Sequence, residues 1–151
     1  MSVDQLLLQS GDTLRLNSDA FVGSLLLESS TTMADRIEIQ FPQTLVQEET
    51  TFTATAYFRD RATKALSIPT TIHYKVVDPI NRHTITDWTS IATPAGSNTI
   101  TITTTENKIR DDANLFETKM LIVKADSGLS TQVIQKKTWR VQNLEGIGEG
   151  V

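Results

Sequence analysis

Between residues 35 and 142 the chain alternates apolar and polar residues in short runs separated by turn-forming residues. Alternation with a period of two places successive side chains on opposite faces of a strand, so each run predicts a strand with one face in the core. The runs recur at roughly the 8–12-residue spacing expected of an all-β sandwich. The pattern predicts seven strands, at residues 36–41, 51–58, 70–77, 83–91, 99–105, 117–125 and 130–141.

The same alternation predicts the faces of these strands. Phe52, Ala54, Ala56 and Phe58 share one face, Ile72, Tyr74 and Val76 point inward, and Ile100 and Ile102 do so with threonines opposite them. Ile85 and Trp88 differ in parity, which indicates a β-bulge or a bend between them. The two tryptophans, Trp88 and Trp139, are the predicted core anchors.

Two stretches depart from the alternation. Residues 106–116 are irregular and predict no convincing helix, whereas residues 120–123 form a continuous apolar run that indicates burial on both faces or at an interface. The predicted fold class is all-β, an immunoglobulin-like or fibronectin III-like antiparallel β-sandwich. A jelly roll or a small barrel needs a similar number of strands and stays open.

The first thirty residues contain a degenerate repeat. Residues 4–11 (DQLLLQSG), 12–19 (DTLRLNSD) and 23–30 (GSLLLESS) each combine a short extended Leu-rich segment with a polar turn. Three such strands are marginal alone, so their Leu side chains need cover. The segment predicts either a meander packed on its own domain or an extended β arm that contacts another subunit. Its candidate partner-contact residues are Leu6, Leu7, Leu8, Leu14, Leu16, Phe21, Leu25, Leu26 and Leu27.

The sequence thus divides into an arm at residues 1–34, a sandwich at 35–143 and a Gly-rich, flexible tail at 144–151. The arm holds four of the acidic residues and only one basic residue, Arg15, in a chain with a net charge of −4. The 23 threonines fit the strand prediction, because β-branched residues pack well on pleated surfaces.

The amino-acid composition excludes several kinds of functional site. The chain has no Cys, which excludes disulfides and thiolate sites, and only two histidines, His73 and His83. The acidic balance argues against a nucleic-acid partner, and no apolar run reaches the length of a membrane helix. No nucleophile elbow or phosphate loop is present. Asp111, Asp112, Asn114 and Glu117 could offer oxygen ligands to calcium, but they lack the usual spacing and read better as a solvated loop. We therefore expect no catalytic residues, cofactor or metal.

Several stretches resemble small structural proteins of tailed bacteriophages. They are residues 72–78 (IHYKVVD), 87–90 (DWTS), 99–103 (TITIT), the ending 139–146 (WRVQNLEG) and the N-terminal Leu repeats. The resemblance implies an Ig-like virion protein that is displayed in many copies and contacts capsid or connector subunits. It carries no site residues over, because the matching positions lie in strands and turns.

The expected function is therefore a non-enzymatic virion component, first a capsid decoration or head protein and second a head–tail connector, neck, tail or baseplate component. Such a protein would be a homo-oligomer, assembled in the host cytoplasm into the virion. An alternative of another class is a carbohydrate-binding sandwich, for which Tyr57, Tyr74 and Trp88 would have to form one exposed aromatic platform.

Overall fold

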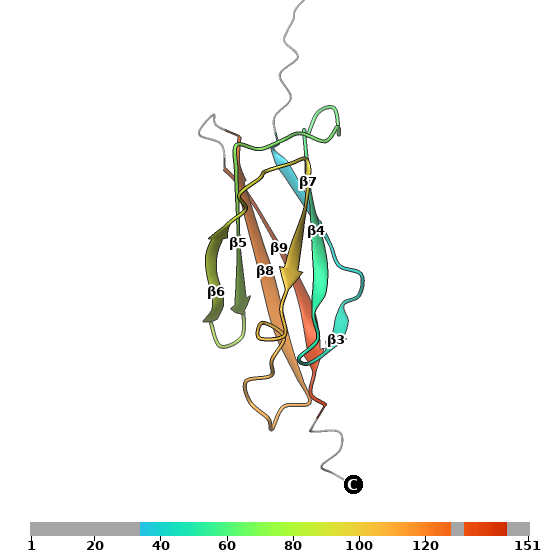
Figure 1. Ribbon diagram of the computed structural model, residues 1–151, viewed down its shortest axis with the longest axis vertical. Helices are drawn as coiled ribbons and strands as arrows, with labels where there is room; N and C mark the ends of the chain where they lie inside the picture. Colours follow the sequence, from blue (N-terminus) through green and yellow to red (C-terminus); the bar gives the residue numbers. More distant parts are fainter. Residues whose placement is uncertain (1–33, 128–131, 145–151) are drawn as a thin grey trace, which may run out of the picture. The chain divides into compact units, whose positions relative to one another are not determined.

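The computed structural model describes residues 34–127 and 132–144, and within them it is a β-sandwich of two packed sheets (Figure 1). The predicted all-β class is confirmed. The described strands are β2 (Arg36–Gln40), β3 (Leu45–Gln47), β4 (Phe52–Arg59), β5 (Thr71–Asp78), β6 (His83–Ser90), β7 (Ser97–Ile102), β8 (Phe116–Asp126) and β9 (Gln132–Gln142).

One sheet has three strands in the order β2-β4-β7, and the other has five in the order β3-β9-β8-β5-β6. All neighbours are antiparallel except β3 and β9, which run parallel. The sequence did not predict β3, because three residues are too few to establish an alternation. The long hairpin of β8 and β9 forms the centre of the larger sheet and turns at one end of the sandwich, which we call the hairpin end (Figure 1).

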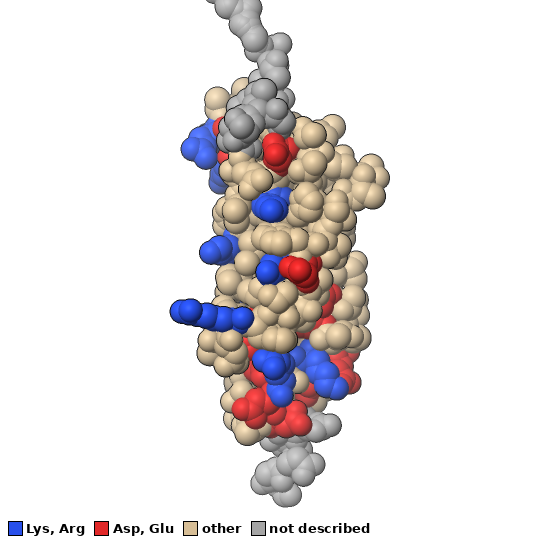
Figure 2. Space-filling view, turned by 90° about the vertical axis from the view of Figure 1, so that its left-hand side faces the viewer, with Lys and Arg blue, Asp and Glu red and all other residues tan. Residues whose placement is uncertain are grey.

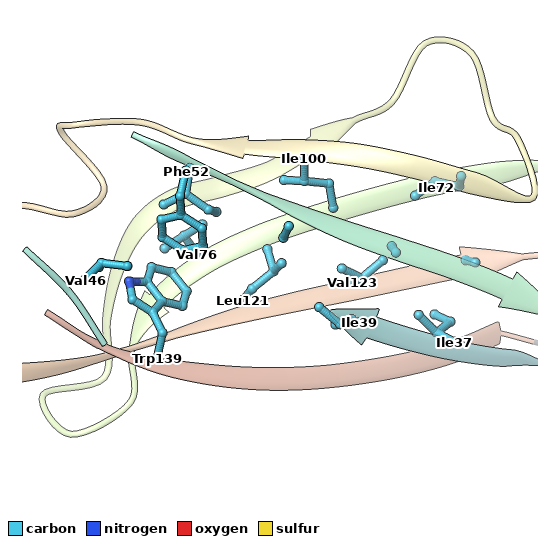
Figure 3. Packing of buried hydrophobic residues seen from close by; sticks show 14 of the residues in the cluster. Ile37, Ile39, Val46, Phe52, Ile72, Val76, Ile100, Leu121, Val123 and Trp139 are labelled. Carbon is cyan, nitrogen blue, oxygen red and sulfur yellow. The ribbon is translucent and has the colours of Figure 1, made fainter. Parts of the chain in front are cut away.

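The core lies between the sheets and is filled by the side chains that the alternation placed inward. Phe58, Ile72, Val76, Ile102, Leu121 and Val123 have no exposed surface, and Ile37, Ile39 and Ile100 are almost fully buried. Figure 3 shows the labelled members of this cluster projecting from both sheets toward one another. Thr53, Thr99 and Thr101 face solvent on the other side of the smaller sheet, as predicted.

Trp139 lies in this core, with 1% of its surface exposed, and its ring meets Phe41 and Phe52 edge to face at 5.6 and 5.5 Å. Its indole Nε1 donates a hydrogen bond of 2.7 Å to Asn107 Oδ1. The Asn107 amide in turn donates to the Thr50 carbonyl at 2.6 Å. Both sheets and the loop after β7 therefore meet at this tryptophan.

Trp88 is not a core anchor, so the prediction is wrong for this residue. The register of β6 against β5 slips twice, with one extra β6 residue between Thr84 and Thr86 and another between Thr86 and Thr89. A single bulge would bring both Ile85 and Trp88 inward, but the second reverses the parity again. Trp88 is 39% exposed and lies under the Lys124 ammonium, 4.5 Å from the ring centroid.

The apolar run at residues 120–123 is likewise not buried on both faces. Leu121 and Val123 point into the core without exposed surface, whereas Met120 and Ile122 are half-buried on the outer face of the larger sheet. Lys75, Lys124, Lys136 and Arg140 belong to strand positions on that same outer face. Figure 2 shows basic side chains standing out along its left edge and most acidic ones toward its lower end.

We predict that the two tryptophans differ sharply in their effect on stability. Trp139→Phe removes the indole N–H and leaves the buried Asn107 oxygen without that donor, so it should lower the free energy of unfolding by about 2 kcal/mol or more. Trp88→Phe should cost less than about 1 kcal/mol. Urea unfolding measures both, and acrylamide should quench the remaining tryptophan strongly in Trp139→Phe but weakly in Trp88→Phe. Equal costs would contradict this assignment.

Candidate assembly surface

Strand β9 is covered by β3 along only part of its length. Arg140 N–H donates to the Thr44 carbonyl at 2.8 Å, and Glu48 N–H donates to the Gln142 carbonyl at 3.0 Å. The pairing of β3 with β9 extends only over residues 140–142. Among the described residues, no strand pairs with β9 at residues 132–139 on the side away from β8.

The backbone groups at this uncovered edge follow from the alternation of an antiparallel ladder. Because Arg140 and Gln142 bond toward β3, the even-numbered residues of β9 direct their N–H and C=O groups away from β8. At the uncovered edge these residues are Ile134, Lys136 and Thr138. The Lys136 carbonyl receives only a long bond of 3.4 Å from the neighbouring Gln135 amide. The edge can therefore accept a further strand.

A second strand edge lies opposite. β2 pairs with β4 alone, and the Phe58 N–H points to Gly96 on the β7 side of β4. The odd-numbered residues of β4 therefore bond to β2, which leaves the N–H and C=O groups of Ile37 and Ile39 directed outward. A groove of about 640 Å³ separates the two edges. We call it the β2–β9 groove, and its lining residues are 35–40, Arg61, Val133, Ile134, Gln135 and Lys137.

The charges of the groove are partly neutralised within it. The Asp35 carboxylate accepts a hydrogen bond of 2.6 Å from the backbone N–H of Arg61, and Glu38 lies 3.5 Å from the Arg59 guanidinium in an exposed ion pair. Lys137 lies 5.7 Å from the centre of the Phe41 ring. Lys136 is the next residue of the same edge and is exposed. The β9 side of the groove is therefore basic.

On the other side of the sandwich, the edge of β6 is less regular than that of β9. β6 carries the two bulges described above, and bulges interrupt the row of backbone groups that a new strand needs. The Glu106 carboxylate accepts the Thr86 hydroxyl of β6 at 2.7 Å and the N–H and hydroxyl of Thr103 at 2.8 Å. This carboxylate joins β6 to the end of β7, so that side is partly closed.

A second cluster of charged groups lies at the end of the sandwich opposite the hairpin end. Lys119 and Glu117 form an ion pair of 2.7 Å with side-chain exposures of 0% and 6%. Burial by itself raises the pKa of Glu117, but the bonds from Lys119 and from the N–H groups of Asp111 and Arg110 outweigh it and leave the pKa below its ordinary range. The bonds from the N–H groups of Asp111 and Arg110 hold the loop after β7 onto β8, and the Lys119 ammonium neutralises the carboxylate that accepts them, so the cluster is structural.

Asp78 has the same structural character. Burial raises its pKa, but the N–H groups of Asn81 and Ile80, the Asn81 amide and the charge of Lys119 together lower it below the ordinary value. The carboxylate of Asp78 thereby caps the turn between β5 and β6.

The carboxylate of Glu117 faces Lys119 and the loop backbone. In the described chain, no group of three or more His, Asp or Glu residues could hold a metal ion.

The remaining predicted residues do not converge on one site. Tyr57 lies on β4 in the smaller sheet, Tyr74 packs against the core from β5, and Trp88 lies on the outer face of the larger sheet. The aromatic platform proposed for carbohydrate binding is therefore not formed. His73 is half-buried on β5 and His83 is exposed at the start of β6.

The candidate arm contacts fall outside the described residues. They are Leu6, Leu7, Leu8, Leu14, Leu16, Phe21, Leu25, Leu26 and Leu27. The sequence places Lys136 and Lys137 side by side, but it does not reveal the groove, because Ile37 and Val133 come together only after both sheets have formed.

We predict that Glu117→Gln lowers stability by about 3 kcal/mol at neutral pH, because it leaves the buried Lys119 ammonium without a charge partner. The native pKa of Glu117 is lowered, so the stabilisation is present above the ordinary glutamate pKa and is lost as pH falls through the lower native value. The cost should therefore shrink in acid. The double variant E117Q/K119M should recover most of the loss in urea unfolding, and a loss that is independent of pH would contradict the assignment.

Comparison with known proteins gives no family, curated protein or solved structure that matches this chain. In the described part of the chain there is no helix with the length and apolar character needed to cross a membrane.

Proposed function

We propose that this protein is a non-enzymatic structural component of a tailed-bacteriophage virion. The observation that carries the proposal is an uncovered, regular strand edge on β9 that lies beside a groove, in a chain whose N-terminal sequence repeats short Leu-rich runs. An open edge offers main-chain hydrogen bonds to a second strand, which is a common way for β-proteins to assemble. The resemblance to phage structural proteins supports the same function.

The strand orders support the finer fold proposal of an immunoglobulin-like sandwich. Two packed sheets with the central hairpin of β8 and β9 in the larger one are in keeping with that architecture. In such a protein the sandwich supplies a rigid body, and its edges and terminal segments supply the contacts.

The proposed location is the capsid, as a decoration or head protein, with the head–tail connector, neck, tail or baseplate as the second choice. The protein would act as a homo-oligomer bound to other virion proteins. Its mechanism is assembly, in which buried Leu side chains and strand pairing provide the free energy of association. No cofactor or reaction is required.

We predict that deleting residues 2–33 leaves a folded sandwich that no longer assembles. Ala34 is retained because it is buried and its carbonyl accepts the Ser127 hydroxyl at 2.9 Å. Circular dichroism and urea unfolding report folding, and light scattering together with co-purification with virions reports assembly. The matched control keeps the arm at full length but replaces Leu6, Leu14 and Leu25 with Ser. Full occupancy of virions by the truncated protein would refute the role of the arm.

A further inference from the structure

We propose that the uncovered edge of β9 is the acceptor for a Leu-rich strand of the N-terminal arm of a second copy of this chain. The proposal rests on the proposed function and specifies its contact. The proposed donor segments are the short Leu-rich runs at residues 6–8, 14–16 and 25–27, and the acceptor is residues 132–139 beside the β2–β9 groove.

The length of the edge fits a short strand. Eight residues of β9 extend over about 26 Å at a rise of about 3.3 Å per residue, and one donor run of three residues needs about 10 Å of that. The outward backbone groups of Ile134, Lys136 and Thr138 can form the new ladder. A strand added here would continue along β9 from the position that β3 occupies at residues 140–142.

The side chains of the acceptor match a Leu-rich donor. One face of the added strand would lie over the groove, where Val133 is partly buried while Ile37 and Ile39 are already almost fully buried in the core. The other face would lie beside Ile134, which is 51% exposed although it is a large apolar residue. Leu side chains of the donor would therefore bury apolar surface mainly at Ile134, with a smaller contribution from Val133.

The charges also match. The arm contains Asp4, Asp12, Asp19 and Glu28 against the single Arg15, whereas the β9 edge presents Lys136 and Lys137. Lysines on an edge strand disfavour pairing with an arbitrary strand. They favour a donor strand that is flanked by acidic residues. The donor repeats place an acidic residue at the start or the end of each Leu run.

The arm of a second copy can lie along the β9 edge without a reversal of the chain close to Ala34. The chain enters β2 at the hairpin end, where Ala34 is buried and bonded to Ser127, and β2 then runs along the groove. Of the chain's own arm, the run at residues 25–27 would have to reverse direction within residues 28–33 before it could lie along β9, whereas the runs at 6–8 and 14–16 are tested by the intramolecular cross-link described below. An arm from another copy has no such constraint, and a head-to-tail contact of this kind can close a ring or extend a lattice.

The first test is Lys136→Pro in the full-length protein. Proline removes the outward N–H and blocks a paired strand, but it leaves the β8 ladder intact because Lys136 does not bond toward β8. Thr101→Pro is the matched control, since Thr101 lies at the outer edge of β7 and its N–H likewise points away from its sheet. Lys136→Ala removes the charge but keeps the backbone N–H, so it separates the effect of the charge from the effect of strand pairing.

We expect Lys136→Pro to weaken self-association about tenfold or more in sedimentation equilibrium, while Thr101→Pro leaves it unchanged. Lys136→Ala should have a smaller effect that fades in high salt. If deletion of residues 2–33 abolishes assembly but Lys136→Pro does not, this acceptor is wrong while the proposed function stands. If neither change matters, both proposals fail.

The second test uses the absence of cysteine from the chain. Arg15→Cys in one full-length chain and Thr138→Cys in another are mixed and treated with a short bis-maleimide. A cross-linked dimer should form in the mixture and not with Arg15→Cys plus Thr101→Cys. The double variant R15C/T138C, diluted to suppress association, tests the other arrangement. If it cross-links within one chain, the arm occupies its own edge and the proposal of a second copy is overturned.

Discussion

The indole of Trp139 makes contacts in three directions, and the positions of both sheets and of the loop after β7 depend on them. Its ring packs edge to face against Phe41 and Phe52, which belong to the segments on either side of β3. Its N–H binds Asn107, whose amide holds the Thr50 carbonyl. A hydrogen bond of this kind contributes most to stability where water is excluded, and a buried donor or acceptor that is left unpaired there lowers stability. The loop is therefore fixed by the core itself.

This anchoring is confined to one end of β9, and the consequence appears at the other. A three-stranded sheet packs on a five-stranded one, so the smaller sheet does not cover the whole inner face of the larger. Trp139 and Val141 are fully covered, whereas Gln135 is exposed although its parity is inward. Residues 132–139 of β9 also lack a strand neighbour on the side away from β8, because β3 pairs only with residues 140–142. The groove and the open edge therefore lie along the same part of β9.

The sequence predicted what depends on local alternation. The strands, their faces and the burial of Trp139 follow from a period of two, whereas Trp88 was misplaced because a second bulge leaves no sign in composition. The loop at residues 106–116 was unreadable because Asn107 finds its partners 57 and 32 residues away. Lys136 and Lys137 are neighbours in the sequence, but the groove beside them is not apparent there, since it needs β2 and β9 to be brought together.

The lysines of the edge resolve a conflict that any assembling β-protein meets. An open strand edge can pair with any extended chain, so it makes the monomer prone to aggregation before assembly. Lys136 and Lys137 raise the cost of pairing with a neutral or basic strand and lower it for an acidic one. A Leu-rich donor with flanking carboxylates can therefore be accepted while the uncovered edges of two copies repel each other. Selection by charge allows the edge to stay regular, whereas β6 is interrupted by its bulges.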